Sequence, residues 1–116
     1  MIKIYGLKNC DTCRKVIKEL REANKNFEFY DFRKDGLSEN NLKEWIKCVG
    51  WEILLNKGGT TWRRVGDEDK LKMNAVKATA LMLEYPALVK RPVFEIGPNV
   101  VVGFKDDVKK VLGLKI

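Results

Sequence analysis

Two of the three cysteines in the sequence, Cys10 and Cys13, stand two residues apart at the start of a helix-like segment. Cys10 comes just before the first helical turn, where free N–H groups and the positive end of the helix dipole stabilise an anion. We therefore expect the pKa of Cys10 to fall from its usual ~8.5 towards or below neutrality. Arg14 lies over the same face of the first turn and adds a positive charge. Lys8 is a second candidate cation, and Asp11 opposes both.

The spacing predicts a reactive dithiol in which Cys10 is the nucleophile and Cys13 resolves the intermediate. Cys13 lies one helical turn further on, where its sulfur can attack a mixed disulfide formed on Cys10. Three alternatives compete with this interpretation. A structural disulfide would close too short a loop to stabilise the fold much, and Cys13 falls on an apolar stripe, where a thiol can be a small buried hydrophobe. A zinc site needs four ligands, but only Cys48 remains and the chain has no histidine, so no metal is expected.

The composition is that of a globular protein that we expect to form one domain over residues 1–116. Hydrophobic residues make up 45% and charged residues 34%, and no apolar run approaches the roughly 20 residues of a membrane helix. The first residues are too mixed for a signal peptide, so a cytoplasmic location is expected. The net charge is +7, and the basic residues are interspersed with acidic ones along the chain. This pattern predicts a solvated surface with neither a membrane contact nor sequence-specific nucleic-acid binding.

The elements that must position the cysteines follow from hydrophobic periodicity. The predicted elements are a strand at 2–5, a helix at 11–23, a strand at 27–32, a helix from Ser38 to Gly50, a helix whose stripe runs from Leu71 through Met82 to Tyr85, strands in 91–96 and 99–104, and a helix at 105–112 with Val108, Val111 and Leu112 inward. This order predicts an α/β, thioredoxin-like fold, β-α-β … β-β-α, with a helical insertion at about 38–86. Cys48 lies beside its helix stripe and is expected to be a semi-buried thiol.

Three segments, "YGLKNCDTCRK", "LLNKGGTTWRR" and "EYPALVKRPVFEIGPNVVVGF", resemble the arsenate reductase (ArsC)/Spx family, most closely its YffB-like members. The resemblance covers essentially the whole chain and implies a thioredoxin-fold, glutaredoxin-related protein. It implies that Cys10 is the reactive cysteine, and Cys13 completes the CxxC of Spx-type redox switches. It also implies that Arg91 and Pro92 are the family's arginine and cis-proline, with the proline facing the reactive cysteine.

The chain departs from the arsenate reductases of this family at two positions. Gly58, beside Lys57, and Phe104 stand where those enzymes carry arginines expected to grip the oxyanion. Arg63 and Arg64 are candidates to compensate, since each can donate a fork of hydrogen bonds. The two missing arginines argue against arsenate reduction.

Three functions fit the sequence. The first is a thiol–disulfide reductase acting on a small thiol or disulfide, with no bound cofactor, glutathione as a candidate electron donor, and Arg91, Arg63 and Arg64 orienting a substrate carboxylate. The alternative is a redox-sensing regulator that binds the α subunit of RNA polymerase, as the Spx-type relatives do. The third is a thioredoxin-fold domain whose cysteines have no present catalytic duty.

Overall fold

The computed structural model describes residues 1–115, which form two compact units. Unit 1 comprises Met1–Gly36 together with the chain from Arg91 onward, and unit 2 comprises Leu37–Lys90. Each unit is described by itself. The expectation of one domain with an insertion at about 38–86 stays a prediction.

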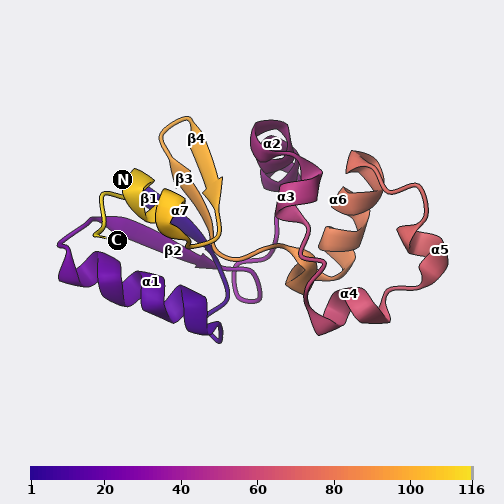
Figure 1. Ribbon diagram of the computed structural model, residues 1–116, viewed down its shortest axis with the longest axis horizontal. Coiled ribbons are helices and arrows are strands. Elements are labelled where there is room, and N and C mark those ends of the chain that lie inside the picture. Colours follow the sequence, from indigo (N-terminus) through magenta and orange to yellow (C-terminus); the bar gives the residue numbers. More distant parts are fainter. Residues whose placement is uncertain (116) are drawn as a thin grey trace. The chain divides into compact units, whose positions relative to one another are not determined.

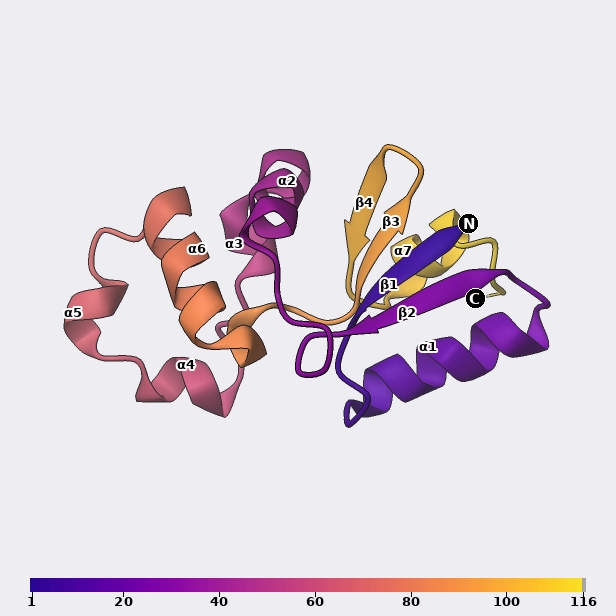
Figure 2. The same ribbon diagram turned by 180° about the vertical axis from the view of Figure 1, so that it is seen from behind.

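Unit 1 is built on a four-stranded sheet in the order β2-β1-β3-β4. The strands are β1 (Ile2–Gly6), β2 (Phe27–Asp31), β3 (Val93–Ile96) and β4 (Asn99–Val102). β1 pairs parallel with β2 and antiparallel with β3, which pairs antiparallel with β4. Helix α1 (Asp11–Glu22) connects β1 to β2, and α7 (Asp106–Val111) follows β4 (Figures 1 and 2). This β-α-β and β-β-α arrangement confirms the predicted thioredoxin-like fold.

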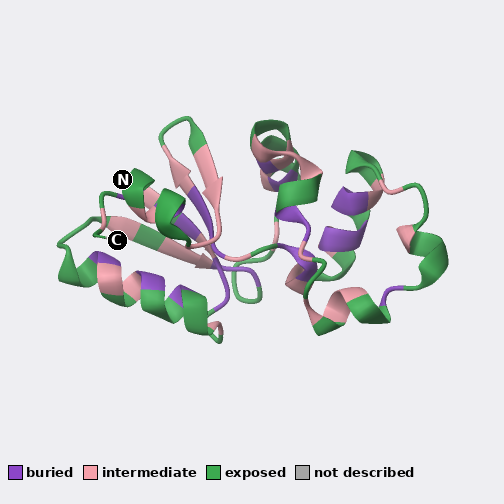
Figure 3. Cartoon of the chain, in the orientation of Figure 1, coloured by how far each residue is buried: buried purple, intermediate pink, exposed green. Residues whose placement is uncertain are grey.

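The core of unit 1 joins both helices to one face of the sheet. Val16 and Leu20 of α1 form a buried cluster with Ile4 of β1 and Phe94 of β3, and all four side chains are 0% exposed. The cluster also includes Val108 and Leu112 from the C-terminal helical segment. Figure 3 shows buried positions recurring along α1 between exposed ones, as an amphipathic helix requires.

One inward position predicted for the last helix is wrong. Val111 is 51% exposed, whereas Val108 and Leu112 are buried as expected. The helix proper is only six residues long. Val108 and Leu112, four residues apart, share the buried face of this short helix, whereas Val111 lies at the edge of that face and reaches solvent.

Unit 2 consists of helices. They are α2 (Glu39–Val49), α3 (Trp51–Leu54), α4 (Thr60–Arg64), α5 (Asp67–Lys70), α6 (Ala75–Glu84) and the 3-10 turn η1 (Pro86–Leu88). α2 starts where the Ser38 side chain accepts a hydrogen bond from the Asn41 N–H, and it ends at Gly50, whose φ is 89°. Both boundaries agree with the prediction. Leu42 and Trp45 of α2 are 0% exposed, as are Met82 and Leu88.

The helix predicted from Leu71 starts later than expected. The Asn74 side chain accepts a hydrogen bond from the Lys77 N–H at 2.9 Å, so α6 begins at Ala75. Leu71 is 64% exposed and lies outside the helix. Leu71 has the helical spacing of the apolar residues in α6 by chance, because it lies before the Asn74 cap. The short helices α3, α4 and α5 were not predicted, because four or five residues are too few for a periodic pattern.

A short backbone bridge closes unit 2 near its end. Leu55 and Val89 form an antiparallel bridge, the Lys90 N–H donates to the Leu54 carbonyl at 2.8 Å, and the Asn56 N–H donates to the Leu88 carbonyl at 2.7 Å. These bonds hold the segment that leads back to β3. No helix within residues 1–115 has the length and apolar character needed to cross a membrane.

Candidate active site

Cys10 is delivered by a tight turn at the end of β1. The Cys10 N–H donates to the Leu7 carbonyl at 3.2 Å, which closes a turn over residues 7–10, and the Cys10 carbonyl accepts the Arg14 N–H at 3.0 Å. Cys10 has extended backbone angles (φ −111°, ψ 123°) and is the residue that caps α1. Its side chain is half-buried. The predicted position just before the first helical turn is therefore the one observed.

The surroundings of Cys10 favour its thiolate. Partial burial raises the pKa of Cys10, but the N–H and thiol of Cys13 and the guanidinium of Arg91 outweigh burial, so the pKa lies below its ordinary value. The Cys10 side chain makes no conventional capping hydrogen bond to the helix. The Cys13 N–H at the start of the helix is nevertheless one of the groups that lower the pKa of Cys10.

Cys13 is the opposite of Cys10 in both burial and charge preference. Its side chain is 0% exposed. Burial and the adjacent Cys10 together raise the pKa of Cys13 to about 12, although the Leu7 N–H and Arg91 act in the other direction. The pair thus consists of a half-buried sulfur whose pKa is lowered and a fully buried sulfur that holds its proton at neutral pH.

Gly6 makes room for the buried sulfur. A Cβ atom at Gly6 would lie 2.6 Å from Cys13 Sγ, closer than any ordinary contact, so only glycine fits without moving the sulfur. Because Gly6 is the last residue of β1, the sheet fixes its position. The sequence contained the glycine but no sign of what it touches.

Arg91 and Pro92 lie at the entry to β3, in the same unit as the two cysteines. The Arg91–Pro92 peptide bond is cis, as the resemblance implies. Arg91 interacts with Cys10 and influences both sulfurs. Pro92 is buried, and its carbonyl accepts the Gly103 N–H at 2.8 Å, which ties it to the end of the β3–β4 hairpin.

The other arginines predicted for the site differ in their surroundings. Arg14 Nη2 lies 2.8 Å from Asp11 Oδ1 in an exposed ion pair, so its charge is shared with the acid expected to oppose it. Arg63 and Arg64 are exposed on α4 of unit 2. The structure describes the two units separately, and the roles proposed for these two arginines stay predictions.

The residues at the two missing-arginine positions have structural partners. Phe104 packs against the core of unit 1, with its ring centroid 6.4 Å from that of Phe94. The Gly58 N–H donates to Asn56 Oδ1 at 3.1 Å. Lys57 Nζ lies 5.3 Å from the Trp51 ring and 5.9 Å from the Trp62 ring.

Asp31 is a buried acid that the sequence analysis missed. It is the last residue of β2, opposite Gly6 in the sheet, and is 7% exposed. Its carboxylate accepts backbone N–H groups from Lys8, Arg33 and Lys34 at 3.1, 2.7 and 3.4 Å. Burial alone raises the pKa of Asp31, but these hydrogen bonds bring it below its ordinary value. A charged residue closing an aromatic strand, "FEFYD", is the signal that could have pointed to it.

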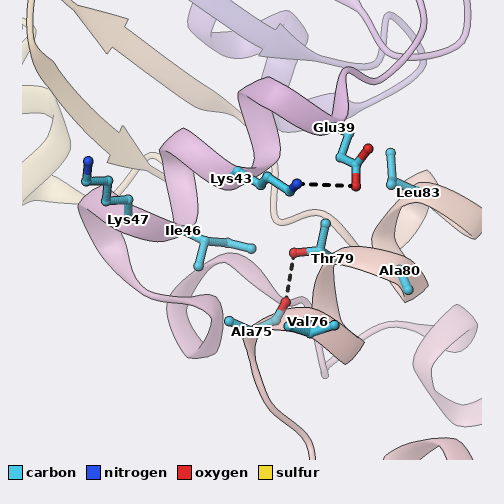
Figure 4. Close-up of a pocket in the computed structure, with 9 residues that line it drawn as sticks. All are labelled: Glu39, Lys43, Ile46, Lys47, Ala75, Val76, Thr79, Ala80 and Leu83. Atoms are coloured by element: carbon cyan, nitrogen blue, oxygen red, sulfur yellow. Dashed lines mark hydrogen bonds and ion pairs between the residues drawn. The ribbon is translucent and has the colours of Figure 1, made fainter.

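Unit 2 contains the third cysteine and a groove, neither of which offers comparable chemistry. Cys48 is exposed rather than semi-buried, because its place beside the stripe of α2 faces away from the core. A groove of about 500 Å³ lies between α2 and α6 (Figure 4). Two of its polar side chains have partners nearby: Lys43 pairs with Glu39 at 3.7 Å, and the Thr79 hydroxyl donates to the Ala75 carbonyl. Within residues 1–115, no three potential metal-ligating side chains gather together.

The chain resembles known proteins over almost its full length. The model of the ArsC family matches residues 5–111. An uncharacterised protein of Haemophilus influenzae is 37% identical over 106 residues, which cover 91% of this chain and 93% of that protein. The solved structure of a YFFB protein matches with a TM-score of 0.90 and 36% identity, covering 96% and 97% of the two chains.

A second solved structure agrees with the first. It is an arsenate reductase (ArsC) related protein from Brucella melitensis, with a TM-score of 0.78 and 38% identity over 97% of this chain and 95% of that one. The family model thus covers both the cysteine pair and the Arg91–Pro92 segment. The chain belongs to the ArsC family.

Proposed function

We propose that the protein is a thiol–disulfide oxidoreductase in which Cys10 attacks the substrate and Cys13 resolves the intermediate. The observation that carries this proposal is the inequality of the two sulfurs. Cys10 is half-buried with a lowered pKa, and Cys13 is fully buried with its pKa raised to about 12. Membership of the ArsC family supports a thiol-based reductase.

The reaction needs no general base, because the groups around Cys10 already lower the pKa of its thiol. The Cys10 thiolate attacks one sulfur of a substrate disulfide, the substrate S–S bond breaks, and one thiolate leaves and takes a proton from water. Formation of the mixed disulfide removes the negative charge beside Cys13. Because that charge raised the Cys13 pKa, its removal makes the second thiol easier to deprotonate. The Cys13 thiolate then attacks Cys10 Sγ and releases the second substrate thiol.

Two electrons must return to the oxidised pair. We propose glutathione as the donor: two glutathione thiols reduce the Cys10–Cys13 disulfide and leave as glutathione disulfide. Arg91, which interacts with Cys10, is suited to hold a substrate carboxylate or the thiolate that forms, because its guanidinium is charged and donates several hydrogen bonds.

Cysteine variants test this mechanism. We expect Cys10→Ser to abolish reduction of a glutathione mixed disulfide in a coupled assay, because no nucleophile remains. Cys13→Ser should keep the monothiol half of the reaction, and Cys48→Ser should match the wild type. The rate should rise with pH through the lowered pKa of Cys10 and level off at a lower pH than the reaction of an ordinary cysteine does.

A wild-type protein with no turnover on glutathione mixed disulfides, or full activity in Cys10→Ser, would contradict the enzyme. Absence of turnover together with capture of the polymerase α subunit would favour the regulator instead.

A further inference from the structure

Asp31 joins the ends of the two parallel strands that flank the site. Its carboxylate accepts the Lys8 N–H after β1, and the Arg33 and Lys34 N–H groups after β2. In the same region the Phe32 N–H donates to the Gly6 carbonyl at 2.8 Å. The turn over residues 7–10 is therefore attached to β2 by a side chain as well as by the sheet.

That turn touches both sulfurs. Its first residue, Leu7, directs its N–H at the Cys13 sulfur, and its last residue is Cys10 itself. Lys8 occupies the second position, and the bond from its N–H to Asp31 is what fixes the turn from outside. A displacement of the turn would shift one sulfur and remove a hydrogen bond from the other.

We propose that Asp31 is a positioning residue for the dithiol: through the Lys8 N–H, its carboxylate fixes the turn that sets the Cys10 and Cys13 sulfurs relative to each other. This inference rests on the proposed thiol chemistry. Asp31 acts through the turn and does not itself touch the substrate. Its burial and its three backbone donors make it a fixed support rather than a mobile surface charge.

The direction in which Asp31→Ala changes the alkylation rate of Cys10 distinguishes a positioning role from a purely electrostatic one. Removing a nearby negative charge would by itself stabilise the Cys10 thiolate and speed its reaction. Releasing the turn would move Cys10 away from the groups that stabilise the thiolate and slow the reaction. We therefore expect Asp31→Ala to slow alkylation of Cys10 by iodoacetamide near pH 6 by roughly threefold or more. It should also shift the dithiol–disulfide equilibrium in a glutathione redox buffer.

Asp35→Ala is the matched control. Asp35 belongs to the same loop and accepts the Asp31 N–H at 2.9 Å, but it makes no bond to the turn. Its removal deletes the same charge and should change the alkylation rate less than about twofold. Rates in a Cys48→Ser background, with circular dichroism as a check of folding, assign the reaction to Cys10. Equal rates for Asp31→Ala and Asp35→Ala, or a faster rate for Asp31→Ala, would overturn the positioning role.

A second pair of variants decides the question if Asp31→Ala does not fold. Lys8→Pro removes the N–H that Asp31 accepts, and proline suits the second position of a turn. Lys8→Ala removes the same charge but keeps the N–H. We expect Lys8→Pro to react about threefold more slowly than Lys8→Ala, and equal rates would overturn the inference. Failure of the proposed function is a separate result, because it would show in the wild type as absence of turnover on glutathione mixed disulfides, whereas this inference is tested by the alkylation rates of the variants.

Discussion

The two units hold their helices and strands together by different kinds of contact. In unit 1, β1 pairs with β3 from the far end of the chain, and one buried cluster ties both helices to the sheet. In unit 2, most order comes from helices, caps and a single isolated bridge. In unit 1, therefore, paired strands hold residues that are distant in sequence beside one another. That is what a site made of Cys10, Cys13, Asp31 and Arg91 requires.

The cysteines illustrate the difference. Cys10 stands at the start of α1, where N–H groups and Arg91 favour an anion, whereas Cys48 lies in the last turn of α2, where carbonyl groups point outward. Both belong to amphipathic helices. The same residue type thus becomes a nucleophile candidate or an ordinary exposed thiol according to which helix end it occupies.

Equivalent core truncations in the two units should separate stability from thiol chemistry. Leu20→Ala in unit 1 and Leu42→Ala in unit 2 each remove a fully buried side chain, so each should cost about 2–5 kcal/mol in denaturant unfolding. Only Leu20→Ala should also change the alkylation rate of Cys10, because Leu20 seats α1 on the sheet. Equal changes in both variants would remove the distinction between the units.

Glycine substitutions give a smaller and sharper contrast. Gly6→Ala should cost about 1–3 kcal/mol and slow closure of the Cys10–Cys13 disulfide, because the new methyl group would lie 2.6 Å from Cys13 Sγ. Gly58→Ala in unit 2 should stay within about 0.5 kcal/mol of the wild type, since its Cβ would meet Asn56 Oδ1 at an ordinary 3.6 Å. The rate of disulfide closure is measured as the loss of free thiol in an oxidising glutathione buffer. A Gly6→Ala protein that closes at the normal rate would contradict the contact.

The smallest effect is expected at Lys57. Its ammonium group lies over Trp51 and Trp62, so Lys57→Ala should lower the unfolding free energy by about 0.5–1 kcal/mol. The reactivity of Cys10 should not change. Lys47→Ala, at the rim of the groove in unit 2, serves as the control for removing a positive charge. A marked loss of reductase activity in Lys57→Ala would instead indicate that Lys57 replaces the missing loop arginine.

The sequence was informative where local rules decide the structure. Caps and periodicity placed α1 and α2, and the order of elements predicted the thioredoxin-like sheet. Cys10 was predicted at the start of α1 because a helix start is a local feature. The same local rules failed for Leu71, where the Asn74 cap interrupted an apolar spacing that seemed continuous.

The spacing of residues along the chain could not predict contacts between residues that are distant in sequence. The sequence analysis assigned the cation near Cys10 to Arg14, four residues away, but Arg14 pairs with Asp11, and Arg91 is the arginine that lowers the Cys10 pKa. Only the resemblance had pointed to Arg91. Asp31 and Gly6 were missed because their contacts depend on the register of β1 with β2, which no single segment encodes.

The contact between Gly6 and the Cys13 sulfur also limits how the site can be damaged. Oxidation of a thiol past sulfenic acid, to sulfinic or sulfonic acid, adds further oxygen atoms to the sulfur and is irreversible in most proteins. Cys13 is fully buried and already fills the space beside the glycine, which leaves an incoming oxygen no room on that side. Its accessible oxidised form is then the bond to Cys10, which thiols can undo, so peroxide stress should spare the Cys13 sulfur.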